Sequence, residues 1–168
     1  MSNGSKKISY SQITDEWIKE NLQNTSRLYD VLWRPLERLL ALILLVILTP
    51  LFLILIIAIK INSHGSAIFK QTRTGLKNKM FTLYKFRSMG ANAEEKTGAV
   101  WSQKNDSRIT QVGNFLRKTH LDELPQLWNI IKGDLAFVGP RPERPELIEV
   151  IKKEVPYFEL RNCILPGI

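Results

Sequence analysis

The most prominent feature of the hydrophobic pattern is an apolar run over residues 39–59. The run contains no charged residue, and only Thr49 and Pro50 depart from its apolar character. A helix over this range reaches about 30 Å, which is the thickness of the hydrocarbon core of a bilayer. Because the rest of the chain is too short to cover so many apolar side chains, a buried helix of a water-soluble protein is disfavoured. We predict a membrane-embedded segment.

Pro50 lies in the middle of this run and predicts a break in the helix. Proline removes one backbone donor and clashes with the carbonyl four residues earlier, here that of Val46. It also disfavours helical dihedral angles at the preceding residue, Thr49, whose hydroxyl can satisfy a carbonyl that the break frees. Two topologies remain open on this pattern: a kinked helix that crosses the bilayer once, and a re-entrant helix.

Basic residues flank the apolar run on both sides, with Arg27, Arg34 and Arg38 before it and Lys60, Lys70, Arg73, Lys77 and Lys79 after it. Basic residues close to a membrane segment prefer the cytoplasmic side. A re-entrant helix would keep both groups in the cytoplasm, whereas a single crossing would leave one group outside. Trp33 suits the membrane–water interface in either topology.

The remaining positions follow shorter patterns typical of an α+β fold. The predicted elements are strands over 67–71, 80–87 and 136–138, and helices over 109–118, 124–131 and 143–153. Gly133 is expected to end the second of these helices and Pro145 to lie in the first turn of the third. We therefore divide the chain into a polar segment with a weak helical pattern (1–30), a membrane helix (31–60) and a cytoplasmic domain (61–168).

Charge supports this division. The chain has 168 residues and a formal net charge of +8, and no acidic residue occurs between Glu37 and Glu94. A basic excess beside an apolar run favours anionic lipid or phosphate-bearing substrates over nucleic acid, since no groove-reading motif is present. The single cysteine, Cys163, excludes an internal disulfide framework and suits a reducing compartment.

The candidate chemistry is concentrated between Asp122 and Arg141. The chain has no phosphate-binding glycine loop and no His/Cys cluster for zinc. Asp122 and Glu123 precede Pro125, which places them at the start of a helix, where carboxylates stay ionised. Such a carboxylate can attack phosphorus or hold a divalent cation. The alternative is structural, with Asp122 or Thr119 capping the helix.

Five basic residues are candidates for binding phosphate: Lys85, Arg87, Arg108, Arg117 and Arg141. Lys85 and Arg87 end a predicted strand, and Arg141 lies in a turn between two prolines that restrict its backbone. For Arg108 and Arg117, which frame a predicted helix, a solvated surface position is the alternative.

Four segments resemble the bacterial sugar transferases, the monotopic phosphoglycosyl transferases. They are KFRSM (85–89), DSRIT (106–110), LDELPQLWNIIKGDLAFVGPRP (121–142) and LPGI (165–168). The similarity covers roughly residues 31–168. It implies a re-entrant membrane helix hairpin, broken at Thr49 and Pro50, followed by a small cytoplasmic α/β domain with surface-associated amphipathic helices. The expected location is the cytoplasmic face of the bacterial inner membrane.

The resemblance also implies a reaction. Asp122 would attack the β-phosphate of a UDP-sugar, release UMP and pass the sugar-phosphate to polyprenyl (undecaprenyl) phosphate. Glu123 would hold Mg²⁺, and the five basic residues would bind the phosphates. The product would initiate assembly of a glycan such as a capsule, exopolysaccharide, O-antigen or glycoprotein, and downstream glycosyltransferases are expected partners.

Three positions depart from the family pattern: Thr49 and Ala136 stand where serine is common, and His120 where a small polar residue is common. Related proteins continue beyond the PGI motif with a stretch that helps to close the domain, whereas this sequence stops at Ile168. That difference supports an alternative function, an inactive or scaffolding homologue that binds membrane and partner enzymes. Intact Asp122 and Glu123 favour the enzyme.

Overall fold

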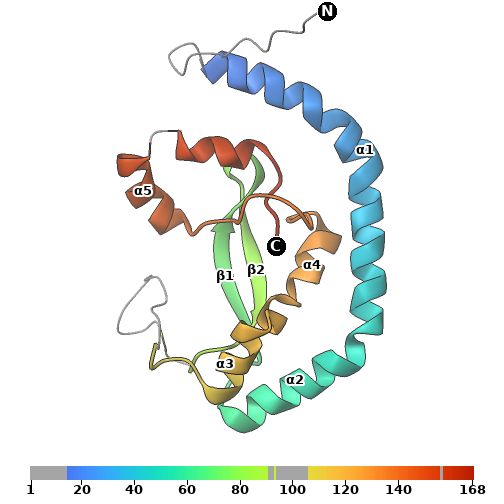
Figure 1. The fold of residues 1–168 in the computed structure, drawn as a ribbon, viewed down its shortest axis with the longest axis vertical. Helices are drawn as coiled ribbons and strands as arrows, with labels where there is room; N and C mark the ends of the chain where they lie inside the picture. The colour runs from blue at the N-terminus through green and yellow to red at the C-terminus, as the bar shows by residue number, and fades with distance from the viewer. Residues whose placement is uncertain (1–14, 91–92, 94–105, 156) are drawn as a thin grey trace, which may run out of the picture.

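A computed structural model describes residues 15–90, 93, 106–155 and 157–168. Two long helices, α1 (Asp15–Ile47) and α2 (Thr49–Asn62), form an angled arm along two sides of a smaller domain (Figure 1). The predicted weak helix in the first 30 residues is confirmed from Asp15 onward; residues 1–14 lie outside the described residues. Most of the predicted loop over 90–107 lies outside them too, as does Pro156.

The predicted break at Thr49 and Pro50 is confirmed. The helix axes on either side of Leu48 differ in direction by 62°, and the Thr49 hydroxyl donates to the carbonyl of Leu45 at 2.9 Å. Within the described residues no single helix has the length and hydropathy of a membrane span, whereas Val31–Ile47 and Thr49–Asn62 together do, as a bent pair.

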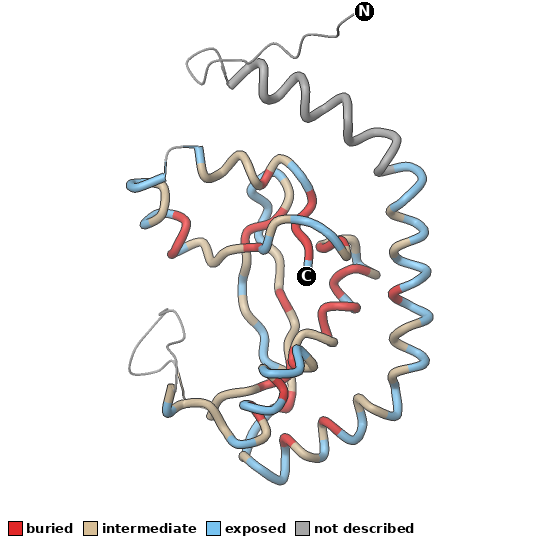
Figure 2. Tube along the Cα trace, in the orientation of Figure 1, coloured by how far each residue is buried: buried red, intermediate tan, exposed pale blue. Residues whose placement is uncertain are grey.

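One side of the arm packs against the domain. Ala41 of α1 joins a core cluster with Leu83, Leu127, Ile130 and Leu135, and Leu55 and Ile59 of α2 join a second cluster with Ala67, Phe86 and Leu116. The other side leaves large apolar side chains uncovered, and Figure 2 shows the exposed positions following the outer edge of both helices. The arm therefore has one face for the domain and one apolar face directed away from it.

The domain contains a two-stranded antiparallel sheet of β1 (Ile68–Thr74) and β2 (Met80–Phe86), which confirms the first two predicted strands. They pair from Ile68 opposite Phe86 to Thr74 opposite Met80, and a short 3₁₀ turn, Leu76–Asn78, connects them. The third predicted strand, over 136–138, is wrong. The segment lies beside residues 165–167, but their pairing is limited to an isolated parallel bridge between Ala136 and Gly167, so no strand forms there.

The predicted helices are confirmed with small shifts of their ends. They are α3 (Gln111–Lys118), α4 (Gln126–Lys132) and α5 (Pro145–Glu154). Gly133 ends α4 with a left-handed φ of 85°, and Pro145 starts α5, both as expected. Two 3₁₀ helices complete the domain: η3 (Leu121–Glu123) and η4 (Phe158–Cys163). The α+β class predicted from the pattern is thus correct.

Asn129 fixes α4 against the free edge of β2. Its side-chain amide donates to the carbonyl of Thr82 at 2.7 Å, and its oxygen accepts from the N–H of Tyr84 at 3.1 Å. These two backbone groups point to the same edge of β2, so the buried amide takes the place of a neighbouring strand. The contact sets the register between β2, which carries Lys85, and the segment before α4, which carries Asp122 and Glu123.

Candidate functional site

A cavity of about 350 Å³ opens between the sheet, the end of α3 and the start of α5. Of the described residues that line it, six are basic, namely Arg73, Lys85, Arg87, Arg117, Arg141 and Arg144. The lining includes two acidic residues, Asp122 and Glu143. This excess of positive charge in a concave site favours an anionic ligand.

The turn between α3 and α4 presents the two adjacent carboxylates. Thr119 closes α3, where its hydroxyl donates to the carbonyl of Phe115 at 2.9 Å, and His120 turns the chain with a left-handed φ of 57°. Asp122 and Glu123 follow in η3, and α4 begins after Pro125 without a side-chain cap. The alternative that Asp122 or Thr119 caps this helix is therefore wrong.

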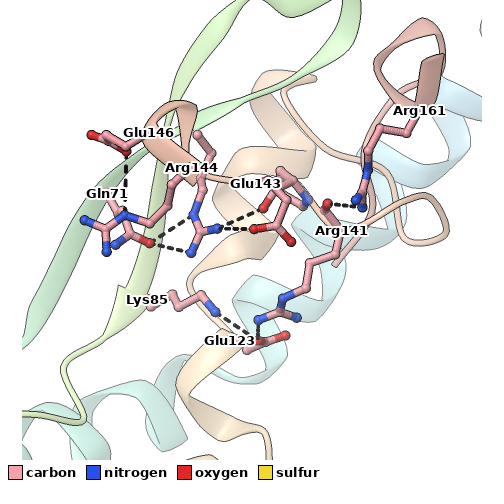
Figure 3. A network of polar contacts seen from close by, with 10 residues as sticks. Gln71, Lys85, Glu123, Arg141, Glu143, Arg144, Glu146 and Arg161 are labelled. Carbon is pink, nitrogen blue, oxygen red and sulfur yellow. Dashed lines mark hydrogen bonds and ion pairs between the residues drawn. The ribbon is translucent and has the colours of Figure 1, made fainter. Parts of the chain in front are cut away.

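Glu123 binds two cations through one oxygen. Its Oε1 accepts from Lys85 Nζ at 2.9 Å and from Arg141 Nη2 at 2.8 Å, and Figure 3 shows both side chains converging on it. Burial by itself raises the pKa of Glu123, but the hydrogen bond from Arg141 and the charge of Lys85 outweigh it and hold the pKa below its usual value. Burial also lowers the pKa of Lys85, against the opposing effect of Glu123.

Asp122 is buried, with 8% of its surface exposed, and it lines the cavity. Burial raises the pKa of its carboxyl, although the positive charges of Lys85 and Arg117 oppose that rise. A carboxylate that is poorly solvated and faces a basic cavity is suited to attack an electrophile there, because little water has to be removed from it.

The structure divides the five predicted phosphate ligands. Lys85, Arg117 and Arg141 line the cavity together with Asp122. Arg87 also lies in its wall, but its guanidinium donates to the carbonyls of Ser63 and His64 at 2.7 Å, and so joins the end of α2 to the domain.

Arg108 does not line the cavity. Its guanidinium binds the carboxylate of Asp106 at 2.8 and 2.6 Å. The role predicted for it, phosphate binding, stays a prediction. The helix break at Thr49 and Pro50 likewise lies outside the cavity wall, and its predicted place in the membrane stays a prediction.

Three cavity residues were missed as ligands from the sequence: Gln71, Arg73 and Arg144. Arg73 donates through Nε to Gln71 Oε1 at 2.9 Å and through Nη1 to the carbonyl of Pro142 at 3.0 Å. The sequence signal that could have identified Gln71 and Arg73 is the alternation of side-chain direction along β1. Phe69 pairs with Lys85, and every second residue from Phe69 lies on the same face of the sheet. That places Gln71 and Arg73 beside Lys85.

The carboxylates determine what metal the site can hold. Among the described residues, no group of three or more His, Cys, Asp or Glu side chains is placed to enclose a metal ion. Mg²⁺ does not require such a group, because it usually takes one or two carboxylates and completes its shell with water and substrate phosphate. Asp122 and Glu123 supply that number of carboxylates, with Asp122 in the cavity wall and Glu123 beside it in η3.

Comparisons with known proteins give a consistent result. Residues 28–168 match the family model described as bacterial sugar transferase. A Bacillus subtilis protein, provisionally named an undecaprenyl-phosphate N-acetylgalactosaminyl 1-phosphate transferase, is 44% identical over 95% of this chain and 86% of its own length.

Two longer relatives match over a smaller share of their length. An Aeromonas hydrophila UDP-N-acetylgalactosamine-undecaprenyl-phosphate N-acetylgalactosaminephosphotransferase is 40% identical over 85% of this chain and 34% of its own. An Escherichia coli UDP-glucose:undecaprenyl-phosphate glucose-1-phosphate transferase is 38% identical over 82% of this chain and 30% of its own. The chain thus spans most of the Bacillus protein and about a third of the other two.

Proposed function

Because the chain belongs to the bacterial sugar transferase family, we propose that it transfers a sugar-1-phosphate from a UDP-sugar to undecaprenyl phosphate. The names of its relatives support both substrates. The observation that carries the proposal is the buried Asp122 carboxylate facing a cavity with six basic residues. A diphosphate is the part of a UDP-sugar that such a cavity would bind.

The proposed reaction has two displacements at one phosphorus. A carboxylate oxygen of Asp122 attacks the β-phosphorus, the bond from that phosphorus to the UMP oxygen breaks, and UMP leaves with the electron pair. The sugar-phosphate then remains on Asp122 as an acyl phosphate. A phosphate oxygen of undecaprenyl phosphate attacks the same phosphorus and displaces the carboxylate, which regenerates Asp122 and gives a polyprenyl diphosphate sugar.

The residues around Asp122 supply charge stabilisation for this chemistry. Phosphoryl transfer depends chiefly on positioning and on neutralising the phosphate oxygens. Lys85, Arg117 and Arg141 lie in the same cavity wall as Asp122 and are the proposed phosphate ligands. Glu123 remains ionised because of Lys85 and Arg141, and it would hold Mg²⁺ together with substrate phosphate. When bound, the ion would neutralise charge on the phosphate oxygens.

The proposed location is the cytoplasmic face of the inner membrane, with the bent pair of α1 and α2 re-entering the bilayer. The exposed apolar face of this arm and the basic residues on both of its flanks support that topology. In a Cys163→Ser background, single cysteines at Lys7 and Lys77 should both react with an impermeant label only from the cytoplasmic side. Labelling of position 7 from outside would instead support a single crossing.

The central experiment measures UMP release and lipid-linked product with Mg²⁺, undecaprenyl phosphate and a panel of UDP-sugars. The panel includes UDP-N-acetylgalactosamine and UDP-glucose, which the relatives' names suggest. We expect product with at least one sugar. Absence of lipid-linked product across the panel would refute the enzyme proposal and favour the scaffolding alternative.

A matched pair of variants tests the nucleophile. With UDP-sugar alone, the protein should gain the mass of a sugar-phosphate on Asp122, and Asp122→Asn should abolish both this adduct and UMP release. Glu149→Gln changes a carboxylate whose side chain is 74% exposed on α5 and should leave both unchanged. An adduct that persists in Asp122→Asn would assign the nucleophile to another residue.

A further inference from the structure

The turn that carries Arg141 is held through three successive backbone carbonyls. The carbonyl of Pro140 accepts from the N–H of Gly167 at 3.1 Å. The carbonyl of Arg141 accepts from Arg161 Nη2 at 2.6 Å, and that of Pro142 accepts from Arg73 Nη1 at 3.0 Å. The three donors come from the LPGI segment, from η4 and from β1, so three separate parts of the fold meet at this turn.

These contacts restrain a backbone that has few donors of its own. Pro140 and Pro142 lack N–H groups, and their rings fix φ on both sides of Arg141. Because the three carbonyls also accept hydrogen bonds, the backbone of the turn has little conformational freedom at Arg141. That side chain is 56% exposed and meets Glu123 through one guanidinium nitrogen. Its direction therefore depends more on the backbone than on packing around the side chain.

Arg161 differs from Arg73 and Arg144 because it is not part of the cavity wall. Its guanidinium lies over the ring of Phe158, 4.6 Å from the centroid, and Figure 3 shows it pointing at the backbone of Arg141. Arg73, by contrast, lines the cavity and could contact a ligand directly. An effect of Arg161 on the site must therefore pass through Arg141.

We propose that Arg161 is a positioning residue that holds the Arg141 carbonyl, and thereby the Arg141 guanidinium, in reach of Glu123 and of the substrate phosphates. Arg73 restrains the next carbonyl in the same way. The inference rests on the proposed function for its catalytic consequence, but the geometric part stands on the hydrogen bonds alone. The competing explanation is that Arg161 only stabilises η4.

A double-mutant cycle separates these explanations. Arg161→Ala should lower kcat/KM for UMP release about 10- to 100-fold, since small displacements at a reacting centre have effects of that size. In an Arg141→Ala background the same change should alter kcat/KM by less than about threefold, because the two residues act as one unit. Equal losses in both backgrounds would overturn the proposal.

Two further variants control for loosening of η4. Lys152→Ala removes the ion pair between Lys152 of α5 and Glu159, which lies in η4 together with Arg161. Because this change does not alter the contact with Arg141, activity should stay within about twofold of the wild type. Arg161→Lys retains a donor and a cation over Phe158 and should recover most of the activity lost in Arg161→Ala. If Lys152→Ala were as damaging as Arg161→Ala, the positioning role would be wrong.

A measurement without turnover tests the geometry itself. In ¹⁵N arginine side-chain spectra, the Arg141 signal, assigned with Arg141→Lys, should show a restrained guanidinium in the wild type and in Lys152→Ala. It should show a freely rotating guanidinium in Arg161→Ala. This result together with no UMP release from any UDP-sugar would refute the proposed function while supporting the positioning role. An unchanged Arg141 signal in Arg161→Ala would refute the positioning role whatever the activity.

Discussion

Replacing Asn129 with leucine tests how the fold holds Lys85 against Glu123. Asn129 is fully buried, with 0% of its surface exposed, and its amide serves two backbone groups of β2 and also Asp134 Oδ2 at 3.2 Å. Leucine has a similar volume but no polar atom. The substitution therefore leaves the Thr82 carbonyl and the Tyr84 N–H without their partner, while it adds buried apolar surface.

The expected magnitude follows from these contacts. An unsatisfied buried donor or acceptor costs about 1–3 kcal/mol, so two of them cost about 2–6 kcal/mol. The buried apolar surface of leucine returns about 2 kcal/mol. Set against a mid-range cost of about 4 kcal/mol, this leaves a net loss of about 2 kcal/mol. In a chain of this size, 1 kcal/mol shifts the thermal midpoint by about 2–4 °C. Asn129→Leu should therefore lower the midpoint by about 4–8 °C.

The assay is thermal unfolding followed by tryptophan fluorescence in one detergent. Gln126→Leu is the matched control on the same helix: Gln126 is also buried, but its side-chain nitrogen has no hydrogen-bond partner among the described residues. By the same reasoning its replacement should not lower the midpoint, because no satisfied donor is lost and an unsatisfied one is removed. Equal shifts in the two variants would refute the assignment of stability to the amide contacts with β2.

Three further substitutions give testable outcomes. Those at Asp122 and Glu123 should change the thermal midpoint in opposite directions, and the one at Gly139 has Gly90→Ala for comparison. Burial raises the pKa of Asp122, so its ionised form destabilises the fold; Asp122→Asn should raise the thermal midpoint near neutral pH, and the gain should vanish by about pH 3. The fold lowers the pKa of Glu123, so its ionised form stabilises the protein near neutral pH, and this stability is lost as pH falls through the pKa of the folded state. Glu123→Gln should therefore lower the midpoint near neutral pH, and the difference from the wild type should shrink as pH falls. Gly139→Ala places a Cβ 2.4 Å from the Leu165 carbonyl oxygen and should abolish UMP release, whereas Gly90→Ala meets nothing within 4 Å and should keep the wild-type thermal midpoint.

The sequence predicted those elements whose causes are local. The helix break follows from Pro50 and its neighbour, and the end of α4 follows from Gly133, which adopts the left-handed conformation that glycine favours. The two strands were predicted from short runs rich in aromatic and β-branched residues on either side of a basic turn that contains Gly75. In each case the responsible residues lie within a few positions of the feature they determine.

The site could be predicted only in part, because its contacts join distant residues. Lys85 and Glu123 are 38 positions apart, and Arg73 and Pro142 are 69 apart. No local pattern reports such pairs, so Arg73, Arg144 and Arg161 were not recognised. Arg108 is the opposite case, because its partner Asp106 is only two residues away. An ion pair between them could have been predicted from the sequence alone.

Asp122 and Glu123 show how adjacent residues of nearly equal chemistry acquire different properties. Burial disfavours the charged form of both carboxyl groups, and by itself it would raise the pKa of each. Only Glu123 receives hydrogen bonds from Lys85 and Arg141, and these reverse the shift, whereas Asp122 has the charges of Lys85 and Arg117 nearby and keeps a raised pKa. Environments that push two carboxylates in opposite directions suit them to two roles. In the proposed reaction, the more basic Asp122, which lines the cavity, would be the better nucleophile, and the ionised Glu123 would be the better anchor for cations. The proposed positioning role of Arg161 would bear on this difference, since Arg141 is one of the two residues whose hydrogen bonds lower the pKa of Glu123.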